Sequence, residues 1–375
     1  MDDKEYLSAP EIISQMPLAL KILLPIVIFK VGERVTARQI QKYRLKKDFE
    51  PTNLDKIVMP PELEQKYDGV DNLKIFGQPR SDVILNFAKF LTTTFPDYDL
   101  TNFYNNINEL KVKEKNLLGL WLATGVGAVG LYLAKSNSIL VHSKLNNKET
   151  NKVLFHELLH MASTVIKDGV RYTGFCQKRV KNGISIIGKG LNEGYTQLLT
   201  ERYCKGPDIC GPSYKQTLKI MIFLEKAIGK EKVERLYFKA DLPGLIKEMG
   251  KYVDKHEIAR FISGTDFIYT YFSSSIKMRK KEEMIKEKFK DVYTILLKMN
   301  IRRLKLDYES NLISEEKMIS EIADSVSSMR EVTGDARERY TYIKDSEITD
   351  ILAESLQNNE LSIRVNSHRH LTPWL

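Results

Sequence analysis

The spacing of hydrophobic residues divides this chain of 375 residues into helical and extended stretches. In RSDVILNFAKFLTTTF, residues 80–95, apolar residues recur three and four positions apart, which predicts a helix. From Leu110 onward, short runs rich in Val, Leu, Ile and aromatic residues alternate with turn residues, which predicts strands. After Tyr214 the helical spacing returns. The helices predicted there cover 215–228, 230–240, 242–252, 256–263, a basic stretch near 277–305, and 314–330.

Two β-hairpins are predicted in the middle of the chain. One pairs Val129–Ala134 with Ile139–His142 across a Lys-Ser-Asn-Ser turn. The other pairs 170–179 with 184–190 and turns at Asn182-Gly183, a dipeptide that favours tight hairpin turns. Further strand-like runs cover 109–115 and 119–125.

A helix is predicted between the two hairpins, and a second helix follows them. The first extends over 150–166. Ahead of it, Asn146 and Glu149 have the spacing of a capping box, in which each side chain binds the backbone N–H of the other residue. The second helix, LNEGYTQLLTERYC, covers 191–204.

We expect the chain to contain three regions: a helical and irregular region over 1–100, an α+β domain over 101–275, and a basic helical region over 276–375. The composition, 42% hydrophobic and 29% charged, is that of an ordinary globular protein. Of the net charge of +9, the segment 277–305 contributes +7, from eleven Lys and Arg against four Asp and Glu. Such a run is more often a solvated helix face than a nucleic-acid or membrane surface, so no nucleic-acid partner is expected.

Two apolar runs are candidates for membrane-spanning helices. Pro17–Phe29 is too short to span a bilayer. Leu117–Ala134 is long enough, but four glycines interrupt it, which favours strands; a membrane-embedded protein stays the alternative. The N-terminus lacks the basic region of a signal peptide, and the three cysteines have no paired spacing, so a cytoplasmic location is expected.

The clearest chemistry lies in VLFHELLHMAS, Val153–Ser163. His156 and His160 are four residues apart, so a helix places both imidazoles on one face, where they can bind one metal ion. Glu157 lies roughly 100° round the helix, off that face but within reach of a water on the metal. Two buried histidines without a partner would cost free energy, which favours a metal site.

A catalytic zinc ion needs a third protein ligand and an open coordination position. The predicted helix that follows the second hairpin opens with Asn192-Glu193. With this pair and the His-Glu-x-x-His sequence, the segment 125–204 resembles the gluzincin group of zinc metallopeptidases. The resemblance implies a zincin-like domain with a small twisted sheet, an active-site helix and one catalytic Zn²⁺ ion.

The same resemblance implies a role for each matching residue. His156, His160 and Glu193 are the expected metal ligands, and Glu157 is the expected general base. The implied activity is hydrolysis of peptide bonds in a peptide or protein substrate by a zinc-activated water. The hairpin before the helix is expected to offer a strand edge that pairs with the extended substrate.

Some positions depart from the gluzincin pattern. Four residues after Glu193, where an aspartate often orients a histidine ligand, the chain has Gln197, whose carbonyl can accept the same imidazole N–H. Asn192 is a further candidate beside the ligands. Glu201 is a competing carboxylate, for which a role outside the metal site is expected. The candidates for a tyrosine that stabilises the transition state are Tyr195, Tyr269 and Tyr271.

The competing interpretation is a non-catalytic interaction or regulatory protein that keeps the zincin fold and binds an acidic partner through its basic helical region. Glu157 argues against it, since a scaffold has no use for a proton acceptor. Another His-Glu pair at His256 lacks a second histidine because position 260 is Arg260. His368 and His370 are expected to lie in a loose tail.

Overall fold

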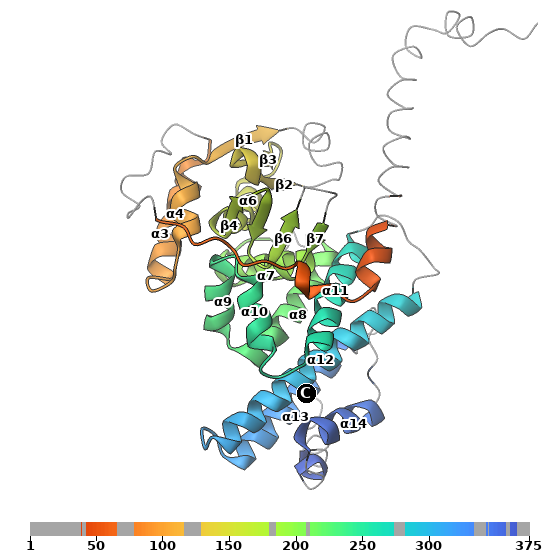
Figure 1. Cartoon of the computed structure of the whole chain (residues 1–375). Coiled ribbons are helices and arrows are strands. Elements are labelled where there is room, and N and C mark those ends of the chain that lie inside the picture. The colour runs from red at the N-terminus through yellow and green to blue at the C-terminus, as the bar shows by residue number, and fades with distance from the viewer. Residues whose placement is uncertain are drawn as a thin grey trace, which may run out of the picture. The chain divides into compact units, whose positions relative to one another are not determined.

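The computed structural model describes residues 39, 43–65, 79–115, 129–179, 185–207, 211–273, 282–333, 343, 345–357 and 361–365. The chain divides into two compact units, Met1–Arg44 and Leu45–Leu375. Almost all described residues belong to the second unit, which combines many helices with two small sheets (Figure 1). The predicted α+β class is therefore confirmed. The boundaries predicted near residues 100 and 275 both fall inside this second unit and stay predictions.

The first sheet contains the predicted hairpin. Strands β2 (Gly130–Leu133) and β3 (Ser138–His142) pair antiparallel, with Leu131 opposite Leu140. Strand β1 (Lys111–Lys115) runs parallel to β3, so the order is β1-β3-β2 and β2 lies at one edge of the sheet as described.

Helix α6 (Asn147–Ala162) follows β3, and its capping box is confirmed. The Glu149 N–H donates to the Asn146 side chain at 3.0 Å, and the Asn146 N–H donates to the Glu149 carboxylate at 3.1 Å. The predicted extension of this helix to residue 166 is wrong, because Thr164–Lys167 forms strand β4. The run Thr-Val-Ile is β-branched and favours a strand, and the turn after it is Asp-Gly, with both residues at positive φ as a tight hairpin requires.

Strand β4 opens a second sheet, an antiparallel meander in the order β4-β5-β6-β7. The other strands are β5 (Val170–Thr173), β6 (Cys176–Arg179) and β7 (Ser185–Ile187). The strand predicted over 170–179 is thus two strands, divided at Gly174, whose φ of 49° makes a turn. The predicted second hairpin corresponds to β6 and β7; its Asn-Gly turn lies outside the described residues.

Helix α7 (Lys189–Tyr203) is the predicted second helix, and it begins two residues earlier than predicted. Its first turn has no cap from its own side chains. Instead, Asp266 on helix α11 (Lys255–Phe272) accepts the backbone N–H groups of Gly188 and Gly190 at 2.8 and 2.6 Å. A distant carboxylate therefore satisfies the free donors that begin this helix.

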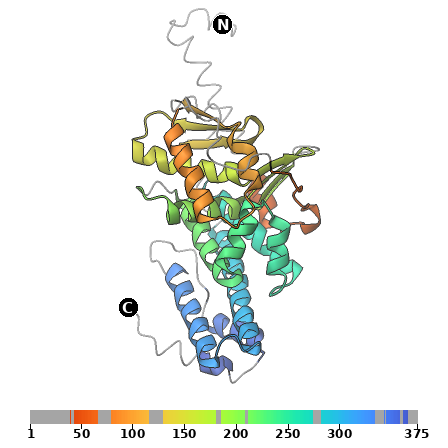
Figure 2. The same ribbon diagram turned by 90° about the vertical axis from the view of Figure 1, so that its left-hand side faces the viewer.

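The described residues after Tyr214 are mainly helical, as predicted. Its helices pack on one another: α8 contacts α7 and α11, and α12 contacts α8, α11, α13 and α14. In Figure 2, the helices coloured from cyan to dark blue, α12 to α14, lie together in the lower part of the view. These helices are α8 (Pro212–Ile228), α9 (Lys230–Phe238), α10 (Leu242–Met249), α12 (Glu282–Glu309), α13 (Glu315–Thr333) and α14 (Asp345–Leu356). Before β1, the described residues contain a helical segment at 43–49, a 3-10 helix at Leu54–Lys56, α3 (Ser81–Thr94) and α4 (Thr101–Ile107). A 3-10 helix at Ala134–Ser136 links β2 to β3.

Many cations of the basic stretch pair with carboxylates of neighbouring helices. Lys290 binds Glu347 on α14, and Lys298 lies between Glu257 on α11 and Glu354 on α14. These cations are therefore neutralised within the chain, and Lys298, whose side chain is 13% exposed, is largely buried; the expected solvated face stays a prediction for the stretch.

No helix in the described part of the chain is long and apolar enough to cross a membrane. Of the two apolar runs in the sequence, 17–29 lies outside the described residues, as does 117–128 of the second. The end of that second run forms strand β2.

The close approach of α7 to α8 gives a testable prediction. A Cβ atom on Gly194 would lie 2.7 Å from the carbonyl oxygen of Thr217, so Gly194→Ala must force the two helices apart. We expect this substitution to lower the free energy of unfolding by about 1–3 kcal/mol, measured by urea denaturation. Gly206→Ala is the control, because its nearest neighbour would be a lysine side chain at 3.4 Å. Equal stability of the two variants would contradict this account of the packing.

Candidate metal site

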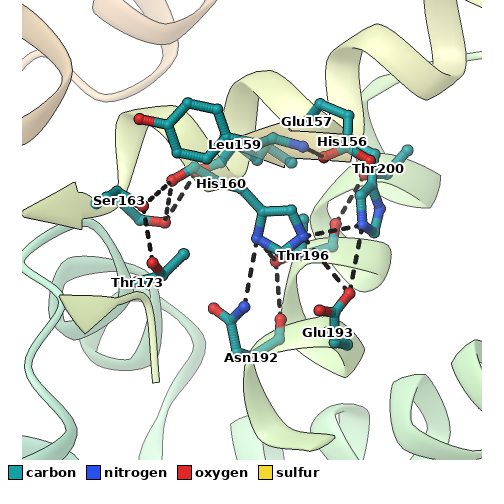
Figure 3. Close-up of polar contacts among 12 residues, drawn as sticks. His156, Glu157, Leu159, His160, Ser163, Thr173, Asn192, Glu193, Thr196 and Thr200 are labelled. Carbon is teal, nitrogen blue, oxygen red and sulfur yellow. Dashed lines mark hydrogen bonds and ion pairs between the residues drawn. The ribbon is translucent and has the colours of Figure 1, made fainter. Parts of the chain in front are cut away.

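Helices α6 and α7 bring together the three predicted ligands (Figure 3). The Nε2 atoms of His156 and His160 lie 3.1 Å apart. Glu193 Oε2 lies 3.7 Å from His156 Nε2 and 3.5 Å from His160 Nε2. This group of two imidazoles and one carboxylate could hold a metal ion.

These separations fit a tetrahedral metal ion. Zinc bonds of about 2.0–2.1 Å place neighbouring ligand atoms about 3.3–3.4 Å apart, close to the three distances between the donor atoms. Two nitrogen ligands and one carboxylate also leave a fourth position open, as in catalytic zinc sites.

The second ring nitrogen of His160 is held by α7. Its Nδ1 atom lies 3.3 Å from the Asn192 side-chain nitrogen and 3.4 Å from Thr196 Oγ1. A metal at Nε2 requires the proton on Nδ1, which then needs an acceptor. The buried Asn192 Oδ1 has no hydrogen-bond partner among the described residues. Turning this amide by 180° places its oxygen beside His160 Nδ1, whose N–H then donates to it.

Thr196, which no sequence motif indicates, supports the same tautomer. Its hydroxyl donates to the Asn192 carbonyl at 2.8 Å, which leaves its lone pairs free to accept from His160 or from the Tyr237 hydroxyl at 2.7 Å. The threonine lies one turn after Asn192 on α7. Together these two residues orient the His160 ring.

Gln197 and Glu201 belong to a different contact. The Gln197 amide nitrogen donates to Glu201 at 2.7 Å, and Glu201 binds Lys152 of α6 at 2.6 Å. The structure therefore describes Asn192 and Thr196, and not the predicted Gln197, beside a histidine ligand. It also separates the two carboxylates of α7, because Glu193 lies with the histidines and Glu201 with the lysine.

Glu157 lies beside the ligands and contacts the first sheet. Its Oε2 atom accepts the backbone N–H of Tyr132 on β2 at 2.7 Å. Burial raises the pKa of Glu157 to about 7; the charge of Glu193 adds to the increase, while the charge of His156 and this hydrogen bond oppose it. A carboxyl with a pKa near neutrality can both take up and release a proton.

Glu193 has the opposite electrostatic environment. Burial by itself would raise its pKa, but the charge of His160 and hydrogen bonds from both histidines hold the pKa well below its usual value. Glu193 is therefore ionised, as a metal ligand must be. The two neighbouring carboxyl groups are thus suited to different roles.

Tyr214, at the start of α8, is a residue near the metal site that the sequence did not indicate. Its ring packs edge-on against His156, with 5.5 Å between the ring centres. Its hydroxyl hydrogen bonds to Tyr269, and burial raises its pKa well above the usual value. No motif surrounds Tyr214, and only the packing of α8 on α7 places it here.

The other tyrosine candidates differ in position. Tyr195 is buried and donates to Glu225 at 2.8 Å, and Tyr271 stacks on Phe267. Tyr269 contacts Tyr214, with 5.9 Å between the ring centres, and Tyr214 in turn contacts the proposed ligand His156.

The weaker sequence candidates have other roles or lie outside the described residues. Glu257 forms a capping box with Asp254, so the second His-Glu pair begins helix α11. Cys176 and Cys204 are free thiols. Cys210, His368 and His370 lie outside the described residues.

Comparisons of this chain with protein-family models, with curated proteins and with solved structures found no significant match. The assignment of a function therefore depends on the geometry and chemistry of the site.

The two carboxylates of α7 give a matched prediction for metal binding. Glu193→Gln should weaken zinc binding by more than about a hundredfold. Loss of a residue that only hydrogen-bonds to a metal ligand already lowers metal affinity about ten- to hundredfold, and Glu193 is itself a proposed ligand. Glu201→Gln keeps an oxygen that can accept from Lys152, so it should leave the affinity within about tenfold of the parent. Zinc titration against a competing chelator measures both. Equal losses in the two variants would contradict the assignment, and a folded parent protein that binds no zinc would favour the scaffold interpretation.

Proposed function

We propose that this protein is a zinc-dependent metallopeptidase of the gluzincin type, built on a zincin-like domain. The observation that supports it most is the cluster of His156, His160 and Glu193, with Glu157 buried beside it. A structural metal site would need only the ligands. The added carboxyl group with a pKa near 7 is what hydrolysis requires.

The ligands and the base have separate tasks. When bound by the three ligands, zinc would supply Lewis-acid chemistry, polarising a substrate carbonyl and lowering the pKa of a water. Glu157 would take the proton of the attacking water and deliver it to the leaving amine. Asn192 and Thr196 would keep the His160 proton on Nδ1.

Strand β2 supports a peptide as the substrate. It lies at the edge of its sheet as described, and its Tyr132 N–H is directed at Glu157 and not at β3. An extended peptide added at this edge would run beside the proposed base and form main-chain hydrogen bonds with outward groups of β2 other than the Tyr132 N–H, which Glu157 occupies. Gly130 permits the close approach of β2 to α6, since a Cβ there would lie 2.3 Å from the side chain of Val153 on α6.

Tyr214 is the residue we propose for stabilising the negative charge that develops on the carbonyl oxygen. Its phenol has a raised pKa and so stays protonated as a hydrogen-bond donor. Its ring contacts His156, and its hydroxyl is oriented by Tyr269.

Glu157→Gln tests the proposed reaction. The amide keeps the size of the side chain but cannot take up a proton, so the variant should bind zinc as the parent does and lose activity about 10²–10⁴-fold. Cleavage of a peptide library, followed by mass spectrometry, measures the activity. Near-normal hydrolysis by the zinc-loaded Gln variant would overturn the proposal.

Tyr214→Phe tests the proposed donor. The substitution removes only the hydroxyl, so kcat should fall about 10²–10³-fold while KM changes little. Tyr271→Phe is the control, because that ring stacks on Phe267, and we expect its kcat to stay near the parent value. If both variants behave alike, Tyr214 has no special part in the reaction.

A further inference from the structure

The second sheet has one buried face and one partly open face. Residues that stand opposite one another on neighbouring antiparallel strands share a face. One such row is buried and packs inward: Val165, Tyr172, Gln177 and Ile187. The residues one position along each strand lie on the opposite face and are exposed or half-buried. We call this set the outer row: Ile166, Arg171, Lys178 and Ile186.

The face that carries the outer row begins next to the candidate metal site. Thr164 and Thr173 lie opposite each other on it, with their hydroxyls hydrogen-bonded at 2.9 Å. The Thr164 hydroxyl also donates to the backbone carbonyl of His160, a proposed ligand, at 2.6 Å. The outer row follows two residues further along the strands, a distance of about 7 Å.

The centre of the outer row has an unusual charge arrangement. Arg171 and Lys178 stand directly opposite each other, and like charges in this position repel. The Arg171 Nε atom is buried without a hydrogen-bond partner in the part of the chain that the structure describes. Arg202, by contrast, pairs with the carboxylates of Glu225 and Glu234. An anion beside the Arg171 guanidinium would supply this missing hydrogen bond.

The field of Arg171 reaches the elements around the metal site. Burial raises the pKa of the Tyr132 phenol on β2 and of the Cys176 thiol on β6, and in each case the charge of Arg171 opposes the increase. The charge of Glu193 acts on the same thiol. A negatively charged ligand at the outer row would therefore act electrostatically on groups of both β2 and β6.

We propose that the outer row is a subsite in which Arg171, assisted by Lys178, binds a carboxylate of the peptide substrate. The inference rests on the proposed function, because it assigns a substrate class to the same site. The planar guanidinium matches a carboxylate through paired hydrogen bonds. Ile166, which is 46% exposed, and Ile186 flank the cations and would contact apolar neighbours in the peptide. The carboxylate is either an acidic side chain or the C-terminal group of the peptide.

Peptide binding to the full-length, zinc-loaded Glu157→Gln variant tests the subsite without requiring cleavage. The probes are short fluorescent peptides that differ only by Glu against Gln, each with a free or an amidated C-terminus. We expect a carboxylate to tighten binding about ten- to hundredfold, and Arg171→Gln to abolish this preference. A preference among amidated peptides identifies the acidic side chain, and one for the free C-terminus identifies the terminal carboxylate.

Arg179→Gln, in the same variant, is the matched control. Arg179 lies on the buried face of the same sheet and also has a buried Nε without a partner in the described chain, so its loss should leave the preference unchanged. Lys178→Gln should reduce the preference partly, and it replaces Arg171→Gln if that variant does not fold. Equal binding of all four peptides, equal effects of the Arg171 and Arg179 substitutions, or Arg171-dependent binding of an oligonucleotide alone would overturn the subsite.

The two proposals can fail separately. If the parent protein cleaves peptides but neither its cleavage nor the binding assay distinguishes Glu from Gln or a free from an amidated C-terminus, the subsite is wrong and the peptidase stands. If no peptide is cleaved while the Arg171-dependent preference persists in binding, the subsite stands and the peptidase assignment falls.

Discussion

The ion pair between Lys152 and Glu201 joins the two helices on which the candidate site depends. Lys152 is only 1% exposed, and its ammonium group finds a hydrogen-bonding partner in the exposed carboxylate of Glu201 at 2.6 Å. Lys152 lies one turn before His156 on α6, and Glu201 lies two turns after Glu193 on α7. The pair and the ligand cluster therefore fix α6 and α7 at two points, and a helix held at two points cannot rotate or slide without breaking one of them.

A second constraint acts on α7 from the other side. Asp266 of α11 accepts the N–H groups of its first turn, and the glycines of α7 allow backbone-to-backbone approach to α8 and α11. The first turn of α7 is also the part that carries Asn192 and Glu193. The three ligand atoms thus keep separations suited to a metal ion because α6, α8 and α11 each hold α7 in a different way.

Local parts of this arrangement could be predicted from the sequence. The capping box of α6, the shared face of His156 and His160, and the β2–β3 hairpin all depend on residues a few positions apart, and their spacing is visible in the sequence. The predicted end of α6 lies too late in the chain, because the apolar spacing of the helix continues into a β-branched run that forms β4. Thr196, Tyr214 and Asp266 could not be found, since each reaches the site or its helices only through packing between distant segments. Gln197 was chosen by analogy with other zinc sites, and its contact with Glu201 reflects the lysine that this chain places on α6.

The hydrogen bond from Tyr132 to Glu157 has a consequence for mutational studies of this protein. The donor is a main-chain N–H, so the orientation of Glu157 is encoded in the path of strand β2 and not in any side chain. An alanine scan across β2 would leave this contact intact and report position 132 as unimportant to it. Only proline, which has no N–H, removes the donor at that position.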